Sequence, residues 1–321
     1  CFWAAARPDL VPRAREISDL LVVDGRTHAL GHHWDWPDSV HTLVDLGTGN
    51  VVAAWRTWWD GDWSHVGCSF DAVAAYGGDV AVAVGLVPIG LGPAYGEVHR
   101  ARHDDVVGTS HRIVSFTRTG LTDLPGPIRL ALGATRAAVR DGVGQIHVTS
   151  PDGTSRVVEA RAGADEPQVV GADDFFFERY GFAAGPTVLE ASIDGGDATP
   201  FRPLEYTSFA TDGATIAWTE GGRLVLATFD GVLHPTDIGP LASAGGGGAW
   251  LGSGYYARFV YEGTRSVLAV YRVADLARAT TDLPTSTFVW PSVLLTDAEL
   301  LAVDPTTGDV LRFPWTSLVF R

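Results

Sequence analysis

Aromatic, imidazole and carboxylate side chains are concentrated near the start of the chain. Six of the 11 tryptophans lie between Trp34 and Trp63. Tryptophan rings stack on the apolar faces of sugars, and carboxylates accept hydrogen bonds from sugar hydroxyls, so this composition suits a carbohydrate-binding cleft. Histidine and aspartate side chains also bind divalent metals, although their order here matches no standard ligand spacing. The candidate ligand-binding residues are His32, His33, Trp34, Asp35, Trp36, Trp58 and Trp59.

A purely structural role remains open for the same residues. Large aromatic side chains fill the space between packed sheets, and polar residues occupy turns. A second histidine group, His99 and His103, offers no better metal site. On a strand these two residues share a face but lie about 13 Å apart, at roughly 3.3 Å per residue. We therefore expect no metal site and no cofactor other than a covalent lipid.

The sequence contains none of the common catalytic or nucleotide-binding motifs. GxSxG, HExxH, the Walker A loop and CxxCH are all missing. The Asp-Gly pairs are explained as turn residues, because aspartate bonds its own backbone and glycine accepts a positive φ. These observations favour a non-catalytic protein, while the question of enzyme activity stays open.

The net charge of the chain is −15, from 23 basic and 38 acidic residues. An acidic surface disfavours nucleic acid as a partner, because its negative side chains and the negative phosphate groups repel each other. All basic residues are arginine and Asn50 is the one asparagine, a usage that fits a GC-rich bacterial genome. No apolar run approaches the roughly 18–20 residues needed to cross a bilayer as a helix.

The first residue of the chain is Cys1, and the sequence contains no methionine. This start resembles that of a mature bacterial lipoprotein, whose first cysteine is lipidated after signal-peptide cleavage. The resemblance implies a lipid on Cys1 and an extracytoplasmic, membrane-anchored location. Phe2 and Trp3 would then lie at the membrane interface or contact a partner. The alternative is a disulfide between Cys1 and Cys68.

The chain that positions these residues is repetitive. A motif of an apolar strand, a tight turn and a second apolar strand occurs seven times. A period near 40 residues made of short strands is typical of a β-propeller blade. The sequence therefore predicts an all-β propeller of seven blades, with six or eight blades as alternatives. The predicted turns are centred on Asp24, Gly77, Ala134, Asp173, Asp212, Ser253 and Asp297.

The repeat sequences at residues 150–160 and 210–231 resemble the short repeats of TolB-like and WD40-like bacterial β-propellers. We expect residues 1–16 to form a lead-in or anchor segment and residues 17–321 to form a single propeller domain. Pairing of the two termini in one blade would close the ring and remove an exposed edge. Residues 85–98 and 245–248 are glycine-rich and are predicted to be loops.

Two functions follow as hypotheses. The first is a non-catalytic, lipid-anchored scaffold or accessory subunit that binds a protein partner in a membrane-associated complex, with the lead-in and residues 85–98 as docking elements. The alternative is a carbohydrate-binding or carbohydrate-cleaving propeller that uses residues 32–65. The expected partner is therefore a protein at a membrane or, under the alternative hypothesis, a glycan.

Overall fold

The computed structural model describes most of the chain from Ile17 onward. The described ranges are 17–35, 38–58, 66–88, 94–102, 114–121, 129–141, 144–150, 152, 154–161, 163–180, 187–204, 209–241, 245–262, 265–282, 292–304 and 307–321. Apart from two three-residue 3₁₀ helices, η1 (Ile193–Gly195) and η2 (Trp315–Ser317), the regular elements in these ranges are β-strands. Neither short helix, nor any other described helical segment, is long and apolar enough to cross a membrane.

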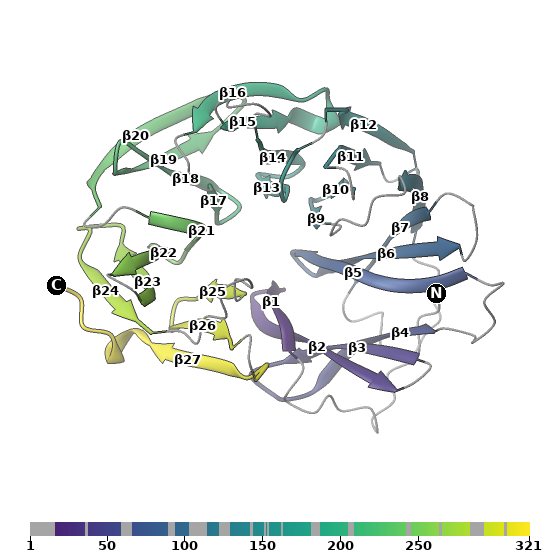
Figure 1. The fold of residues 1–321 in the computed structure, drawn as a ribbon, viewed down its shortest axis with the longest axis horizontal. Coiled ribbons are helices and arrows are strands. Elements are labelled where there is room, and N and C mark those ends of the chain that lie inside the picture. The colour runs from purple at the N-terminus through teal and green to yellow at the C-terminus, as the bar shows by residue number, and fades with distance from the viewer. Residues whose placement is uncertain are drawn as a thin grey trace. The chain divides into compact units, whose positions relative to one another are not determined.

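The strands form antiparallel sheets in chain order, labelled in Figure 1. The first three sheets consist of β1 (Ile17–Val23), β2 (Arg26–Asp35), β3 (Asp38–Asp45) and β4 (Val51–Trp58); β5 (Val66–Tyr76), β6 (Asp79–Pro88), β7 (Ala94–Arg102) and β8 (Val114–Leu121); and β9 (Arg129–Leu132), β10 (Ala137–Arg140), β11 (Ile146–Thr149) and β12 (Ser155–Glu159). The fourth and fifth consist of β13 (Gln168–Val170), β14 (Asp174–Arg179), β15 (Thr187–Ser192) and β16 (Thr199–Leu204); and β17 (Ala210–Thr211), β18 (Thr215–Glu220), β19 (Arg223–Phe229) and β20 (Leu233–Pro240). The last two consist of β21 (Gly245–Gly252), β22 (Tyr255–Glu262), β23 (Arg265–Arg272) and β24 (Arg278–Thr281); and β25 (Val293–Leu295), β26 (Glu299–Val303) and β27 (Val310–Pro314).

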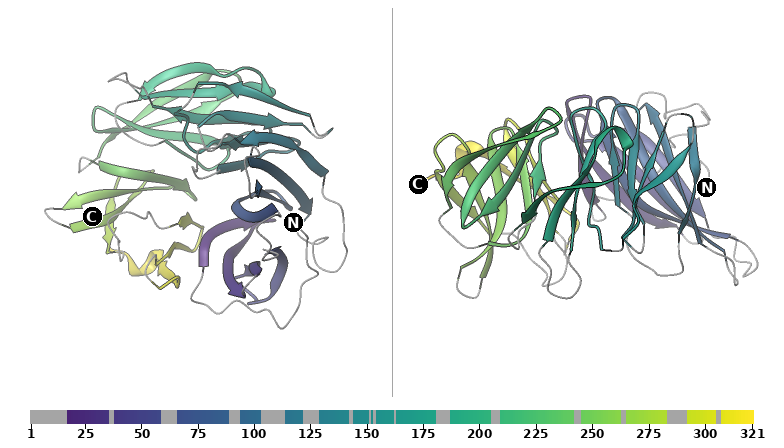
Figure 2. Two further views of the ribbon diagram at one scale, coloured as in Figure 1. Left: turned by 45° about the vertical axis from the view of Figure 1, so that its right-hand side comes forward. Right: turned by 90° about the horizontal axis from the view of Figure 1, so that it is seen from above.

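The fold class is all-β and is that of a β-propeller, as predicted. The predicted number of seven blades is corrected to six, one of the two alternatives, because only six of the described sheets have the four strands of a complete blade; the remaining sheet, β25–β27, has three. After β27 the chain turns through η2 and does not return to add a fourth strand. Instead, the backbone of Arg321 exchanges two hydrogen bonds of 2.9 and 3.0 Å with Arg278 at the start of β24. Figures 1 and 2 show the yellow end of the chain leaving β27 in this way.

The chain divides into two compact units, and each is described by itself. The first unit comprises Cys1–Phe177 and Ala191–Thr199, and the second comprises Glu178–Glu190 and Pro200–Arg321. The predicted closure of a ring by the two termini stays a prediction, because residues 1–16 lie outside the described ranges.

The predicted turns join the first and second strands of each sheet. Asp24 and Gly25 have φ values of 49° and 71°, and Ser253 and Gly254 have values of 50° and 76°. Two consecutive positive φ values define the tight hairpin turn whose twist matches that of the flanking strands. Aspartate, serine and glycine tolerate this conformation, which is why these positions can be recognised in the sequence.

Two glycine-rich segments predicted to be loops are largely strand. Gly85 pairs with Gly96 and Leu86 pairs with Tyr95, so β6 and β7 extend through most of residues 85–98. Pro88 is tolerated because it is the last residue of β6, where a ladder bond is not required. Residues 245–248 begin β21, and Gly248, with φ 77°, lies where the register with β22 shifts. Glycine here forms a β-bulge and not a loop.

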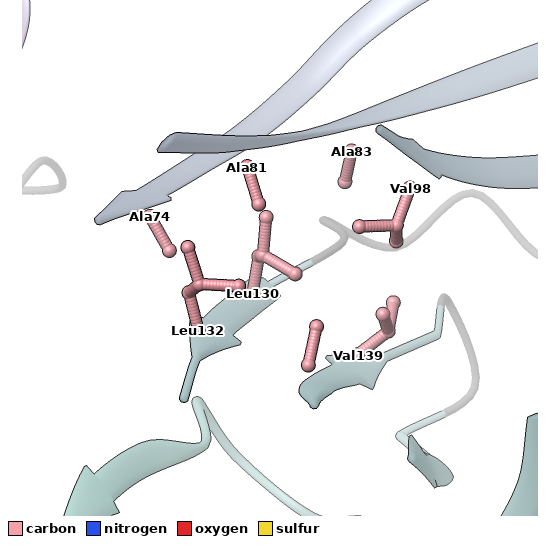
Figure 3. Packing of buried hydrophobic residues seen from close by; sticks show 8 residues of the cluster. Ala74, Ala81, Ala83, Val98, Leu130, Leu132 and Val139 are labelled. Atoms are coloured by element: carbon pink, nitrogen blue, oxygen red, sulfur yellow. The ribbon is translucent and has the colours of Figure 1, made fainter. Parts of the chain in front are cut away.

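Apolar side chains of successive sheets pack against each other in the first unit. Figure 3 shows Ala74, Ala81 and Ala83 facing the larger Leu130 and Leu132 of β9, all at most 9% exposed. Small residues opposite large ones allow the close packing that protein interiors require. Burial of such apolar surface, at about 25 cal/mol per Å², is the main stabilisation of these sheets.

Polar contacts connect the turns of the third and fourth sheets. The amide of Ala134 donates to the carbonyl of Ala172 over 2.7 Å. The Oδ1 atom of Asp173 accepts the amides of Thr135 and Arg136, each at 2.9 Å. A Cβ on Gly133 would lie 2.5 Å from the Ala172 carbonyl oxygen, so only glycine fits at this approach.

Candidate functional site

A group of charged residues in the first unit is positioned by β9 and β10. Arg129 begins β9, Arg140 ends β10, and the two lie directly opposite each other in the antiparallel register. Like charges at opposed positions repel, so the pair requires acidic neighbours. These neighbours come from β1 and from the segment before β13. We call Asp19, Arg129, Arg140, Asp165 and Glu166 the arginine–carboxylate site.

The segment before β13 is held against β10 by backbone and side-chain bonds. Nε of Arg140 donates to the carbonyl of Ala164 over 2.6 Å, and the amide of Ala164 donates to Gly144 over 3.0 Å. These bonds place Glu166 beside Arg129, with Oε2 3.5 Å from Nε. The amide of Glu166 also donates to Oδ1 of Asp165 over 2.8 Å. Asp165 and Glu166 therefore belong to one segment that is bonded to Arg140 and Gly144.

Glu166 is the titratable group of most interest at this site. Burial raises its pKa to about 7; Arg129 and Arg140 act to lower it, while Asp19 and Asp165 raise it further. The side chain nevertheless keeps 58% of its surface open to solvent. Water on the open side weakens the effect of burial, so the pKa is raised but stays within the physiological range.

Asp19 belongs to β1, so a carboxylate of the first sheet acts on Glu166. Oδ1 of Asp19 accepts the amide of Leu20 over 2.8 Å, which fixes the side chain close to its own strand. Its charge raises the pKa of Glu166, as expected for a nearby group of the same sign. The site thus combines three carboxylates with two guanidinium groups.

The sequence analysis did not identify this site, although one signal was present. Arg129 and Arg140 stand on either side of the predicted turn at Ala134, and a hairpin centred there places them opposite each other. The contribution of Glu166 could not be found in the same way. It depends on how the following segment packs against β10, which no local pattern reveals.

The predicted lipid-attachment and interface residues, Cys1, Phe2 and Trp3, lie outside the described residues, as do Trp36 and Trp59. The other predicted ligand-binding residues lie on strands of the first sheet whose backbone is described. His32, His33, Trp34 and Asp35 belong to β2, and Trp58 ends β4. The register connects them through β3, because Asp38 pairs with both Asp35 and Trp58.

Two aspartates near η1 lie close to guanidinium groups. Arg136 is 3.7 Å from Asp194, and Arg156 forms an ion pair with Asp197. Among the side chains that the structure describes, no three histidine, cysteine or acidic residues form a group able to hold a metal.

No protein-family model and no curated protein sequence matches this chain. Solved structures do match. Streptogramin B lyase aligns with a TM-score of 0.53 and 12% identity, over 100% of this chain and 97% of that chain. The β-propeller domain of the trilobed protease from Pyrococcus furiosus aligns with a TM-score of 0.53 and 10% identity, over 95% of this chain and 97% of that chain.

The third comparison is with an acylaminoacyl peptidase from Pyrococcus horikoshii, with a TM-score of 0.50 and 10% identity. The match covers 94% of this chain but 51% of the peptidase, so this chain spans about half the length of that enzyme. At identities of 10–12% these likenesses establish the fold and nothing about activity. The chain is therefore similar to known β-propellers, which confirms the resemblance found in its repeats.

Proposed function

We propose that this protein is a non-catalytic β-propeller that lies outside the cytoplasm and binds a protein partner. It would act as an interaction scaffold or accessory subunit of a membrane-associated complex, attached to the membrane by a lipid on Cys1. The arginine–carboxylate site is the observation that carries the proposal. It holds charged groups on the strands β1, β9 and β10 and on the adjoining segment before β13, and its Glu166 side chain is 58% exposed, so a partner can reach it.

The chemistry of the site favours a basic partner. Three carboxylates face two guanidinium groups, and the whole chain carries a charge of −15. A lysine or arginine side chain of the partner that contacts Glu166 would bind it in its ionised form and release a proton where that group was protonated. The long-range negative field would also speed the encounter with a basic surface.

The similar solved structures include enzymes as well as a propeller domain. They are a lyase, an acylaminoacyl peptidase and the propeller domain of a protease, and the match to the peptidase covers 51% of that chain. Propellers support catalysis and binding alike, so the shared fold does not decide between these classes. The proposal rests on the charged site and on the sequence, in which the common catalytic motifs are missing.

The test is co-purification from native membranes with and without the acidic side of the site. The double variant Asp19→Asn, Glu166→Gln removes two charges while keeping the shape of both side chains. We expect it to bind the co-purified partner at least about tenfold more weakly, a loss of about 1.4 kcal/mol. Asp237→Asn is the matched control, because Asp237 is an exposed acid paired with Arg223 elsewhere in the chain. Recovery of the wild-type protein alone and monomeric would contradict the proposal.

The membrane attachment is tested separately by intact-mass analysis of the natively purified protein. We expect an N-terminal cysteine carrying a diacylglycerol and a further acyl chain, since two or more chains are needed for stable anchoring. An unmodified Cys1, or a disulfide between Cys1 and Cys68, would contradict the anchor. The proposal of a protein partner would then be tested by the co-purification alone.

A further inference from the structure

A buried arginine lies within the apolar core of the second unit. Arg258 is 3% exposed and stands on β22 between Tyr256 and Val260, on the same face of the strand. Tyr256 and Val260 pack in one hydrophobic cluster with Ala217 of β18 and Leu224 of β19. The side chain of Arg258 therefore lies in apolar surroundings, where a charge without a partner is strongly destabilising.

The strand register places small residues on both sides of Arg258. Its partner on β21 is Ala249, and its partner on β23 is Ala269. Directly opposed residues share a face and have Cβ atoms about 5 Å apart, so a larger side chain at either position would take the space beside the arginine. Both alanines pack with the same apolar cluster. The two neighbouring strands therefore bring no counter-charge to Arg258 at these positions.

Among the residues that the structure describes, none forms a hydrogen bond or an ion pair with the guanidinium group of Arg258. One acid acts on the same region, because the charge of Glu178 raises the pKa of Tyr256. Glu178 is 4% exposed, and its Oε1 atom accepts the amide of Phe209 over 2.6 Å. One oxygen of this carboxylate is thus bound to the backbone that precedes β17, and the guanidinium keeps its N–H donors for another partner.

The hydroxyl group of Tyr256 is a second donor in this region. Tyr256 is 1% exposed, and burial raises its pKa to about 12, so the hydroxyl group stays protonated at physiological pH. The charge of Arg258 acts to lower this pKa more strongly than the charge of Glu178 acts to raise it. The positive charge therefore dominates at the hydroxyl group, and it favours an anion over a cation there.

We propose that Arg258 and the hydroxyl group of Tyr256 bind a small monovalent anion of the size of chloride. The guanidinium group supplies the charge and a fork of N–H donors, and the tyrosine supplies one further donor. A larger anionic ligand would not reach groups that are at most 3% exposed, whereas a single ion needs little more room than a water molecule. This site shares no residue with the arginine–carboxylate site and does not depend on the proposed function.

The test is thermal denaturation in mixtures of sodium chloride and sodium gluconate at constant ionic strength. Gluconate is too large for a buried site, so the comparison separates chloride binding from general screening by salt. We expect the melting temperature of the wild-type protein to rise as chloride replaces gluconate. A dissociation constant about tenfold below the highest chloride concentration would give a rise of about 3 °C.

Arg258→Met removes the charge, and its melting temperature should not respond to the exchange of gluconate for chloride. Tyr256→Phe keeps the ring and should reduce the response, so it tests the site even if Arg258→Met does not fold. The matched control is Arg223→Met, which removes an exposed arginine paired with Asp237 and should respond to chloride as the wild-type protein does. An equal response in Arg258→Met and the wild-type protein would overturn the proposal. So would a wild-type melting temperature that is the same in chloride and in gluconate.

Discussion

His147 Nε2 lies 2.9 Å from Oδ2 of Asp141, and both side chains are buried within the third sheet. The other carboxylate oxygen, Oδ1, accepts the amide of Gln145 over 2.9 Å. One aspartate thus closes the turn between β10 and β11 and provides the partner that a buried imidazole requires.

Replacement of Asp141 by alanine should destabilise the protein strongly. The turn would lose its hydrogen bond to Gln145, and the buried imidazole of His147 would lose its carboxylate. We expect the free energy of unfolding to fall by about 2–4 kcal/mol, measured by urea denaturation. The control is Asp152→Ala, since Asp152 is exposed and bonds only Thr154 among the contacts described for it. A similar loss of unfolding free energy in both variants would show that burial of the Asp141–His147 pair does not cause the loss.

Glu166 should make stability depend on pH near neutrality. Its folded-state pKa is raised from 4.5 to about 7, so the folded protein holds this proton more tightly than the unfolded chain. The resulting stabilisation is full below about pH 4.5 and is lost as the pH rises through 7.

The variant Glu166→Gln cannot ionise and should lack this dependence. Compared with the wild-type protein, it should therefore be relatively more stable at pH 8 than at pH 5. Urea denaturation of both proteins at the two pH values measures the difference. A stability difference that does not change with pH would show that the pKa of Glu166 is not raised.

Removing one member of the ion pair between β14 and β15 should lower the unfolding free energy strongly. Nε of Arg179 donates to Oε1 of Glu190 over 2.7 Å, and Glu190 is fully buried. Arg179→Met would leave this carboxylate without its guanidinium, and we expect a loss of about 3–5 kcal/mol in unfolding free energy.

Two further variants test whether burial causes that loss. The double variant Arg179→Met, Glu190→Leu should recover much of the stability, because the buried charge is gone. Arg223→Met breaks the exposed pair with Asp237 and should cost less than about 1 kcal/mol. Equal losses for Arg179→Met and Arg223→Met would refute the distinction.

Trp315 should contribute to the stability of the last two sheets through both its ring and its N–H. The ring stacks on Tyr255 at 3.9 Å between centroids, and Nε1 donates to the carbonyl of Thr296 over 2.8 Å. We expect Trp315→Ala to cost about 3 kcal/mol and Trp315→Phe, which keeps a stacking ring, about 1 kcal/mol. Thermal and urea denaturation would measure both. A larger loss for phenylalanine than for alanine would exclude the stacking contribution.

The sequence predicted the fold class because its signals are local. A turn such as Asp24-Gly25 or Ser253-Gly254 needs residues that accept a positive φ, and those residues can be read directly. The same local reasoning failed at residues 245–248, because glycine forms bulges within strands as well as loops. The pairing of Arg321 with Arg278 could not be predicted locally either, since it is a tertiary contact.

The candidate sites were less accessible to sequence reasoning than the fold. In the tryptophan-rich region, the face of the sheet that a position occupies depends on register, because a shift of one residue exchanges the two faces of a strand. The raised pKa of Glu166 depends on residues of β1, β9 and β10 that are distant in sequence. The sequence could therefore identify the tryptophan-rich region, but not which of its residues share a face of the sheet.

The contact between Asp173 and the turn of Thr135 and Arg136 has a further consequence for how the molecule opens. Local unfolding of either hairpin would leave donors or acceptors of the other without partners, so the two openings are energetically coupled. The amides of Ala134, Thr135 and Arg136 would then exchange with solvent deuterium at rates close to one another. These rates would follow the rarer opening of both sheets together and not the fraying of one turn.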